Sequence, residues 1–121
     1  FSTGVTEKQV IKNLTIFPLS NYFMTSILSS AGCISSAGFE SNAEALYLEK
    51  PLLCIPIKNQ YEQSCNAAAL EKLGVTISKD LDKNKIETWI KTRTILPKLK
   101  VSSAEDLAKK IIDYGLNISK S

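Results

Sequence analysis

The stretch from residue 33 to residue 74 constrains the fold more than any other part of the chain. Two runs, CISSAG and PLLCIPI, are each followed by a segment with helical spacing, the first over roughly residues 40–50 and the second ended by Gly74. Short runs that are apolar on both faces are typical of buried parallel strands. The pattern predicts an α/β fold, with a Rossmann-like parallel sheet flanked by helices.

Weaker signals predict the elements that precede this stretch. A strand is expected over residues 13–19 and a helix over residues 22–32. The apolar residues of that helix recur at helical spacing, so we expect them all to be core: Phe23, Met24, Ile27 and Leu28.

The elements after Gly74 are predicted in the same way. We expect a short strand at residues 75–77, a short helix at residues 86–90, and a last helix over about residues 103–114. Ser102 and Glu105 form a capping box at the start of that last helix.

Composition limits the class of protein. With 121 residues, 44% hydrophobic and 22% charged, residues 1–121 are expected to form a single soluble domain with one core. No run approaches the roughly 18 apolar residues of a membrane span, and no signal pattern opens the chain, so a cytoplasmic protein is expected. The chain begins at Phe1 as though cut at the end of a strand, so we expect an N-terminally truncated domain.

The chain contains no histidine, which excludes several kinds of site. A Ser-His-Asp or Cys-His nucleophile, a histidine zinc site and a histidine general base cannot be built from it alone. The three cysteines include no CxxC pair and are expected to be buried structural thiols: Cys33, Cys54 and Cys65. We expect no metal.

Residues 83–100 are basic, although the net charge is only +3. An anionic membrane surface or a phosphate-bearing partner would explain this, but a solvated face near Trp89 is the simpler interpretation. No aromatic-interleaved basic pattern indicates nucleic acid. The charged residues are Lys83, Lys85, Glu87, Lys91, Arg93, Lys98 and Lys100.

Both strand-to-helix corners carry polar residues, and ligands bind at the strand C-termini of such sheets. Gly38 permits a positive φ or a close approach, and with Ser41 the corner suits an anion, although such corners are often only turns. Glu44, in the first turn or so of its helix, suits either a ribose diol or the helix dipole. Glu62, Gln63 and Asn66 suit sugar hydroxyls or form a capping cluster.

The string SSAGFESNAEALYLEKPLLCIPIKNQYEQSCNAAALEKLGV resembles the donor-binding signature in the C-terminal domain of GT-B glycosyltransferases, nearest to family-28-like bacterial enzymes. The resemblance implies diphosphate binding at one corner, ribose binding by Glu44, and donor-sugar binding by Glu62 and Gln63 with Asn66 in support. Ser36 replaces a histidine found in many such enzymes, and Glu40 replaces an asparagine. The implied diphosphate residues are Ser36, Gly38, Phe39 and Ser41.

The resemblance implies a hexosyl transfer from a nucleotide diphosphate sugar, a UDP-sugar by analogy, to an unknown acceptor. This donor is a substrate and not a cofactor. The catalytic base and the acceptor site are expected outside this chain, in an N-terminal domain or subunit, so the fragment alone should be inactive. This expected activity is compatible with an acceptor at the inner face of the membrane. The truncated sheet is also compatible with pairing of two copies through an open edge. A separate donor-binding subunit, or an epimerase-like or noncatalytic protein on this fold, remain alternatives.

Overall fold

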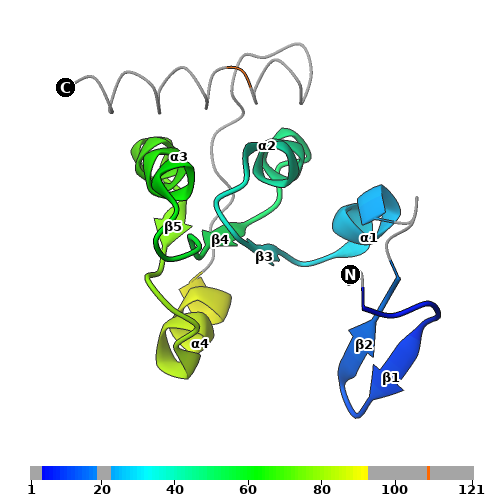
Figure 1. The fold of residues 1–121 in the computed structure, drawn as a ribbon. Helices are drawn as coiled ribbons and strands as arrows, with labels where there is room; N and C mark the ends of the chain where they lie inside the picture. Colours follow the sequence, from blue (N-terminus) through cyan, green and yellow to red (C-terminus); the bar gives the residue numbers. More distant parts are fainter. Residues whose placement is uncertain (1–3, 19–22, 93–108, 110–121) are drawn as a thin grey trace. The chain divides into compact units, whose positions relative to one another are not determined.

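The computed structural model describes residues 4–18, 23–92 and 109 of the 121. The chain divides into two compact units, Phe1–Ser30 and Ala31–Ser121, and each is described by itself. Figure 1 labels the helices and strands.

The first unit contains a hairpin that the sequence predicted only in part. Strand β1 (Gln9–Ile11) pairs antiparallel with β2 (Leu14–Ile16), so the strand expected at residues 13–19 is confirmed over β2. β1 was not predicted, because its two-residue connection lacks the Asn-Gly or Asp-Gly signal of a tight hairpin. Lys12 takes the left-handed conformation there, with φ 54°.

Helix α1 (Phe23–Ser29) confirms the helix expected in this unit but buries fewer side chains than predicted. Ile27 is buried and Phe23, one turn earlier, is half-buried, whereas Met24 and Leu28 are 38% and 56% exposed. The expectation that all four form core is therefore wrong. Residues four apart lie on the same side of a helix, and in α1 the pair Phe23 and Ile27 lies on the buried side. Met24 and Leu28 form the next such pair, which is rotated away from that side.

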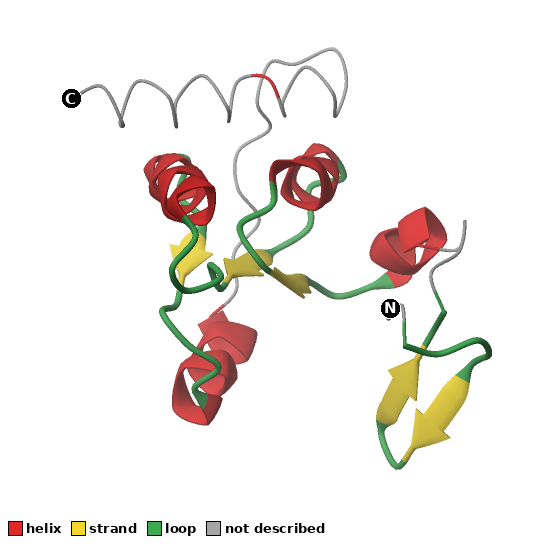
Figure 2. Ribbon diagram, viewed as in Figure 1, coloured by secondary structure: helices red, strands yellow, loops and turns green. Residues whose placement is uncertain are grey.

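The second unit contains a three-stranded parallel sheet of strand order β3-β4-β5. Cys33 of β3 (Cys33–Ser35) pairs with Leu52 of β4 (Leu52–Cys54), and Leu53 pairs with Thr76 of β5 (Thr76–Ile77). Figure 1 and Figure 2 show α2 (Phe39–Tyr47) and α3 (Tyr61–Lys72) on one side of this sheet and α4 (Lys83–Thr92) on the other. This arrangement confirms the Rossmann-like α/β fold.

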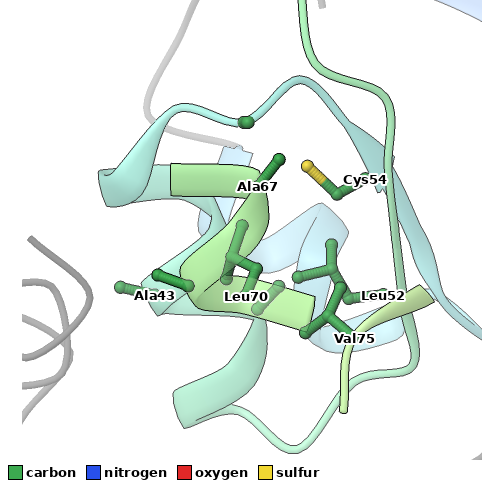
Figure 3. Close-up of a cluster of buried hydrophobic side chains, with 9 residues drawn as sticks. Ala43, Leu52, Cys54, Ala67, Leu70 and Val75 are labelled. Atoms are coloured by element: carbon green, nitrogen blue, oxygen red, sulfur yellow. The ribbon is translucent and has the colours of Figure 1, made fainter. Parts of the chain in front are cut away.

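Strand β4 lies at the centre of the sheet and is buried along its whole length. Leu52 and Cys54 face α2 and α3, where they join a cluster of buried side chains. Most members of this cluster are alanines, and it also includes Leu70 and Val75 (Figure 3). Successive strand residues point to opposite faces, so Leu53 faces Trp89 of α4. Burial on both faces explains why PLLCIPI carries no polar residue.

Helix α3 ends as the sequence predicted, at a glycine in the left-handed region. Gly74 has φ 93°, and its N–H donates to the Glu71 carbonyl at 2.9 Å while the Val75 N–H donates to the Leu70 carbonyl at 3.0 Å. These two bonds form a Schellman motif, which satisfies the last carbonyls of the helix.

Helix α4 is longer than the predicted residues 86–90. Two exposed ion pairs accompany it, Lys83–Glu87 at 3.8 Å and Lys85–Asp80 at 3.9 Å, and pairs of this kind stabilise a protein little. The structure does not describe three of the basic residues, Arg93, Lys98 and Lys100. The last predicted helix and its capping box also lie outside the described residues, except for Lys109, which is helical. In the part of the chain that is described, no helix is long and apolar enough to cross a membrane.

Two glycines give a matched test of this packing. A Cβ on Gly32 would lie 2.9 Å from Cη2 of Trp89 and 3.3 Å from the Pro51 carbonyl oxygen, whereas a Cβ on Gly38 would meet nothing within 4 Å. Gly32→Ala should therefore lower the free energy of unfolding by about 1–3 kcal/mol through overpacking. Gly38→Ala should change it by less than about 1 kcal/mol. Urea denaturation followed by Trp89 fluorescence measures both, and equal losses would contradict the packing of Trp89 on Gly32.

Cys54 gives a test based on pH. Burial raises the pKa of its thiol from 9.0 to about 11, so the folded chain holds this proton more tightly than the unfolded chain does. The associated stability is complete below pH 9 and is lost as the pH rises towards 11, by at most about 2–3 kcal/mol. Cys54→Ala should flatten this part of the alkaline stability profile. Parallel profiles for the wild type and Cys54→Ala would refute the assignment.

Candidate functional site

The corner between β3 and α2 lies at the C-terminal end of a sheet strand, where the sequence placed an anion site. Gly38 is the N-cap of α2 and has φ −67° and ψ 143°, so of the two uses predicted for this glycine, a positive φ or a close approach, the backbone does not adopt the first. Among the residues that the structure describes, no side chain caps this helix start. Its first N–H groups therefore have neither a helical partner nor a side-chain cap.

Asn42, on the second turn of α2, reaches back under this corner. Its side chain is fully buried, and its Nδ2 donates to the Ser36 carbonyl at 2.7 Å and also to the Gly38 carbonyl. Its Oδ1 accepts a hydrogen bond from the Ser35 hydroxyl. One amide side chain thus connects the end of β3 with the start of α2.

Two side chains from α3 reach the same corner from the neighbouring crossover. Oε1 of Gln63 accepts hydrogen bonds from the N–H of Ala37 at 2.7 Å and from the N–H of Ile57 at 3.3 Å. Nδ2 of buried Asn66 donates to the Ala37 carbonyl at 2.9 Å. The structure therefore joins the two polar corners that the sequence singled out separately.

The other residues predicted for the diphosphate lie at the start of α2. Ser36 and Ser41 are exposed. The Phe39 side chain packs against the hydrophobic cluster, so a ligand at the corner would meet its backbone N–H rather than its ring. Exposed Glu40 is the acidic residue of the first turn.

Glu44 lies in the second turn of α2 and not in the first, because the helix begins at Phe39. It is half-buried, and it lies three residues after Ser41 and four after Glu40, a spacing that places all three on one side of the helix. Glu62 is exposed in the first turn of α3. The cap of α3, Gln60, makes no side-chain hydrogen bond there.

Asn42 is the site residue that the sequence analysis missed. Its position did carry a signal, because it lies three and four residues before Ala45 and Leu46 and therefore on the apolar side of the helix. A buried asparagine on such a side needs hydrogen-bond partners, and the nearest available ones are the carbonyls of the corner.

A cavity of about 370 Å³ lies elsewhere, between α4 and strands β4 and β5. None of the residues predicted for the site lines it, and its walls include Leu53, Ile77 and Trp89. Among residues 4–18, 23–92 and 109, no cluster of three histidine, cysteine or acidic side chains could hold a metal ion.

The contact of Gln63 with Ala37 can be tested by substitution. Gln63→Leu would leave the N–H of fully buried Ala37 without its acceptor, which should cost about 1–3 kcal/mol in the free energy of unfolding. Gln63→Glu keeps an acceptor oxygen and should lose much less. Urea denaturation gives the stability, and faster hydrogen exchange at the Ala37 amide in the leucine variant identifies the bond. Unchanged exchange there would show that Gln63 does not hold the corner.

Comparison with known proteins adds the family. A family model described as glycosyl transferase family 1 matches residues 1–94, most of the chain. No curated protein and no solved structure matches.

Proposed function

We propose that this chain, which belongs to glycosyl transferase family 1, binds the nucleotide-sugar donor at the corner between β3 and α2. A role in glycosyl transfer and a GT-B glycosyltransferase domain follow from the family. The assignment to the donor, and within it to a UDP-sugar, is our proposal. The observation that carries it is the uncapped start of α2 beside carbonyl groups held inward by amide side chains.

The diphosphate would bind the N–H groups at the start of α2. These groups lack helical partners, and the helix dipole adds positive potential at the same point. The Ser36 and Ser41 hydroxyls are exposed and can donate to phosphate oxygens. As the sugar leaves, negative charge grows on the diphosphate, and fixed N–H donors would stabilise it without reorganising.

The sugar and ribose would be held by side chains of opposite hydrogen-bonding character. Oε1 of Gln63 already accepts two backbone N–H groups, so its amide NH₂ is the part left to donate to a hydroxyl. The exposed carboxylate of Glu62 can accept from a hydroxyl, and Glu44 can accept from the two ribose hydroxyls. Asn66 would act on the ligand indirectly, by fixing the Ala37 peptide group.

The remaining parts of the proposal concern what acts with this chain. A chain without histidine would take its general base from an acceptor domain or subunit, as in the family-28-like bacterial enzymes that the sequence resembles. Transfer would then be of the hexosyl type, in the cytoplasm or at the inner face of the membrane. In the described sheet, β3 and β5 are the edge strands, and either could pair with a second copy.

Glu44 gives the test of this function. Glu44→Ala should weaken UDP binding about tenfold, because a carboxylate that accepts two ribose hydroxyls is lost. It should not change the affinity for 2′,3′-dideoxy-UDP, which lacks those hydroxyls. Isothermal titration calorimetry measures both ligands, and Glu71→Ala, an exposed carboxylate on α3, is the control. A wild-type protein that binds no nucleoside diphosphate would refute the proposal, and equal losses for both ligands would remove Glu44 from the ribose site.

A further inference from the structure

We propose that the cavity of about 370 Å³ between α4 and strands β4 and β5 binds a neutral planar heterocycle that carries a cyclic amide. The ring would lie between Trp89 and the backbone of Ile77. The volume of the cavity is within the range of small-molecule sites, about 300–1,000 Å³. None of the residues proposed for the donor lines it, so this inference does not depend on the donor site.

The open edge of β5 supplies a hydrogen-bond donor and an acceptor. Cys54 of β4 pairs in register with Ile77, and its carbonyl accepts the N–H of Ser78 at 2.9 Å. The residues on either side of Ile77 therefore bond to β4, and the N–H and C=O of Ile77 itself face the open edge. Among the residues that the structure describes, none bonds to these two groups. The Ile77 side chain packs against the cluster beneath α2 and α3, so its backbone is the part that lines the cavity.

Buried apolar side chains form the floor of the cavity. Leu53 and Trp89 line it and are 1% and 8% exposed. The indole is held at its far end, since a Cβ on Gly32 would lie 2.9 Å from its Cη2 atom. A planar ring suits this floor, because aromatic rings pack favourably against one another in offset or edge-to-face arrangements.

The polar groups of the lining favour a neutral ligand. The hydroxyls of Thr88 and Thr92 donate to carbonyls of their own helix at 2.9 and 2.8 Å. The Ser78 hydroxyl donates to the Asp80 carbonyl at 2.8 Å. Lys85 is the one charged residue among the described residues of the lining, and it pairs with the Asp80 carboxylate at 3.9 Å. A charged ligand would lose its hydration here without gaining an unpaired opposite charge.

The length of the edge decides between a small molecule and an extended peptide. Addition of a peptide strand needs a row of outward-facing backbone groups, whereas β5 spans only Thr76–Ile77 and offers one such residue. A cyclic amide carries an N–H beside a C=O in one plane, so it can bond to both backbone groups of Ile77 at once. These two bonds would orient the ring, and its apolar body would lie against Trp89.

Oxindole and N-methyloxindole test the proposal, because they differ only in the N–H next to the carbonyl. In a titration of the ¹⁵N-labelled protein, oxindole should shift the Ile77 amide resonance and the indole resonance of Trp89, the only tryptophan of the chain. N-methyloxindole should bind at least about tenfold more weakly, since the Ile77 carbonyl would have no donor. A wild type in which oxindole shifts neither resonance, or equal affinities for the two compounds, would overturn the proposal.

Thr88→Phe and Lys91→Phe are matched variants on α4, because both side chains are exposed and only Thr88 lines the cavity. Thr88→Phe should fill the cavity and weaken oxindole binding at least about tenfold, while Lys91→Phe should stay within about threefold of the wild type. Equal affinities of the two variants would contradict the assignment to this cavity. If Thr88→Phe does not fold, the comparison of the two compounds on the wild type decides. An N-acetylated valine tripeptide methylamide should bind more weakly than oxindole, and tighter binding would replace the proposal with strand addition.

Discussion

The corner between β3 and α2 depends on three amide side chains that satisfy successive backbone groups. Asn42, Asn66 and Gln63 between them bind the carbonyls of residues 36–38 and the N–H of Ala37. A buried backbone group without a partner would cost about 1–3 kcal/mol, so these contacts also stabilise the fold. Because the amides come from both α2 and α3, the corner exists only when the two helices are packed on the same sheet.

Small side chains make this packing close enough for short amides to reach. The cluster beneath α2 and α3 contains fully or almost fully buried Ala43, Ala45, Ala67 and Ala69, with Leu70 as its largest member from α3. Alanines allow a helix backbone to lie near the sheet, and a site that depends on side chains as short as asparagine needs that proximity. A larger residue at these positions would both overpack the core and move the amides away from the corner.

The sequence predicted the parallel sheet and its two crossovers because their signals are local and strong. PLLCIPI is apolar on both faces, and Gly74 ends α3 in the conformation that only glycine adopts easily. Prediction from the sequence failed where the outcome depends on tertiary contacts. Nothing local to Leu28 shows that it is exposed, and nothing local to Gln63 shows that its acceptor oxygen serves Ala37 and Ile57. Asn42 is an intermediate case, because the sequence shows that it lies on the apolar side of the helix but does not show which groups it binds.

The choice of amides at the corner also fixes how it responds to its surroundings. Asparagine and glutamine do not titrate, so the directions of these peptide groups are independent of pH where histidine or carboxylate would change charge. They also add no net charge at a place where the helix start supplies positive potential. A buried carboxylate in the place of Asn42 would accept but not donate, and would set a negative charge beneath the helix start where we propose that the diphosphate binds. A neutral hydrogen-bond donor on α2 therefore meets two requirements of this corner. It binds the backbone carbonyls, and it does not weaken the positive potential at the start of the helix.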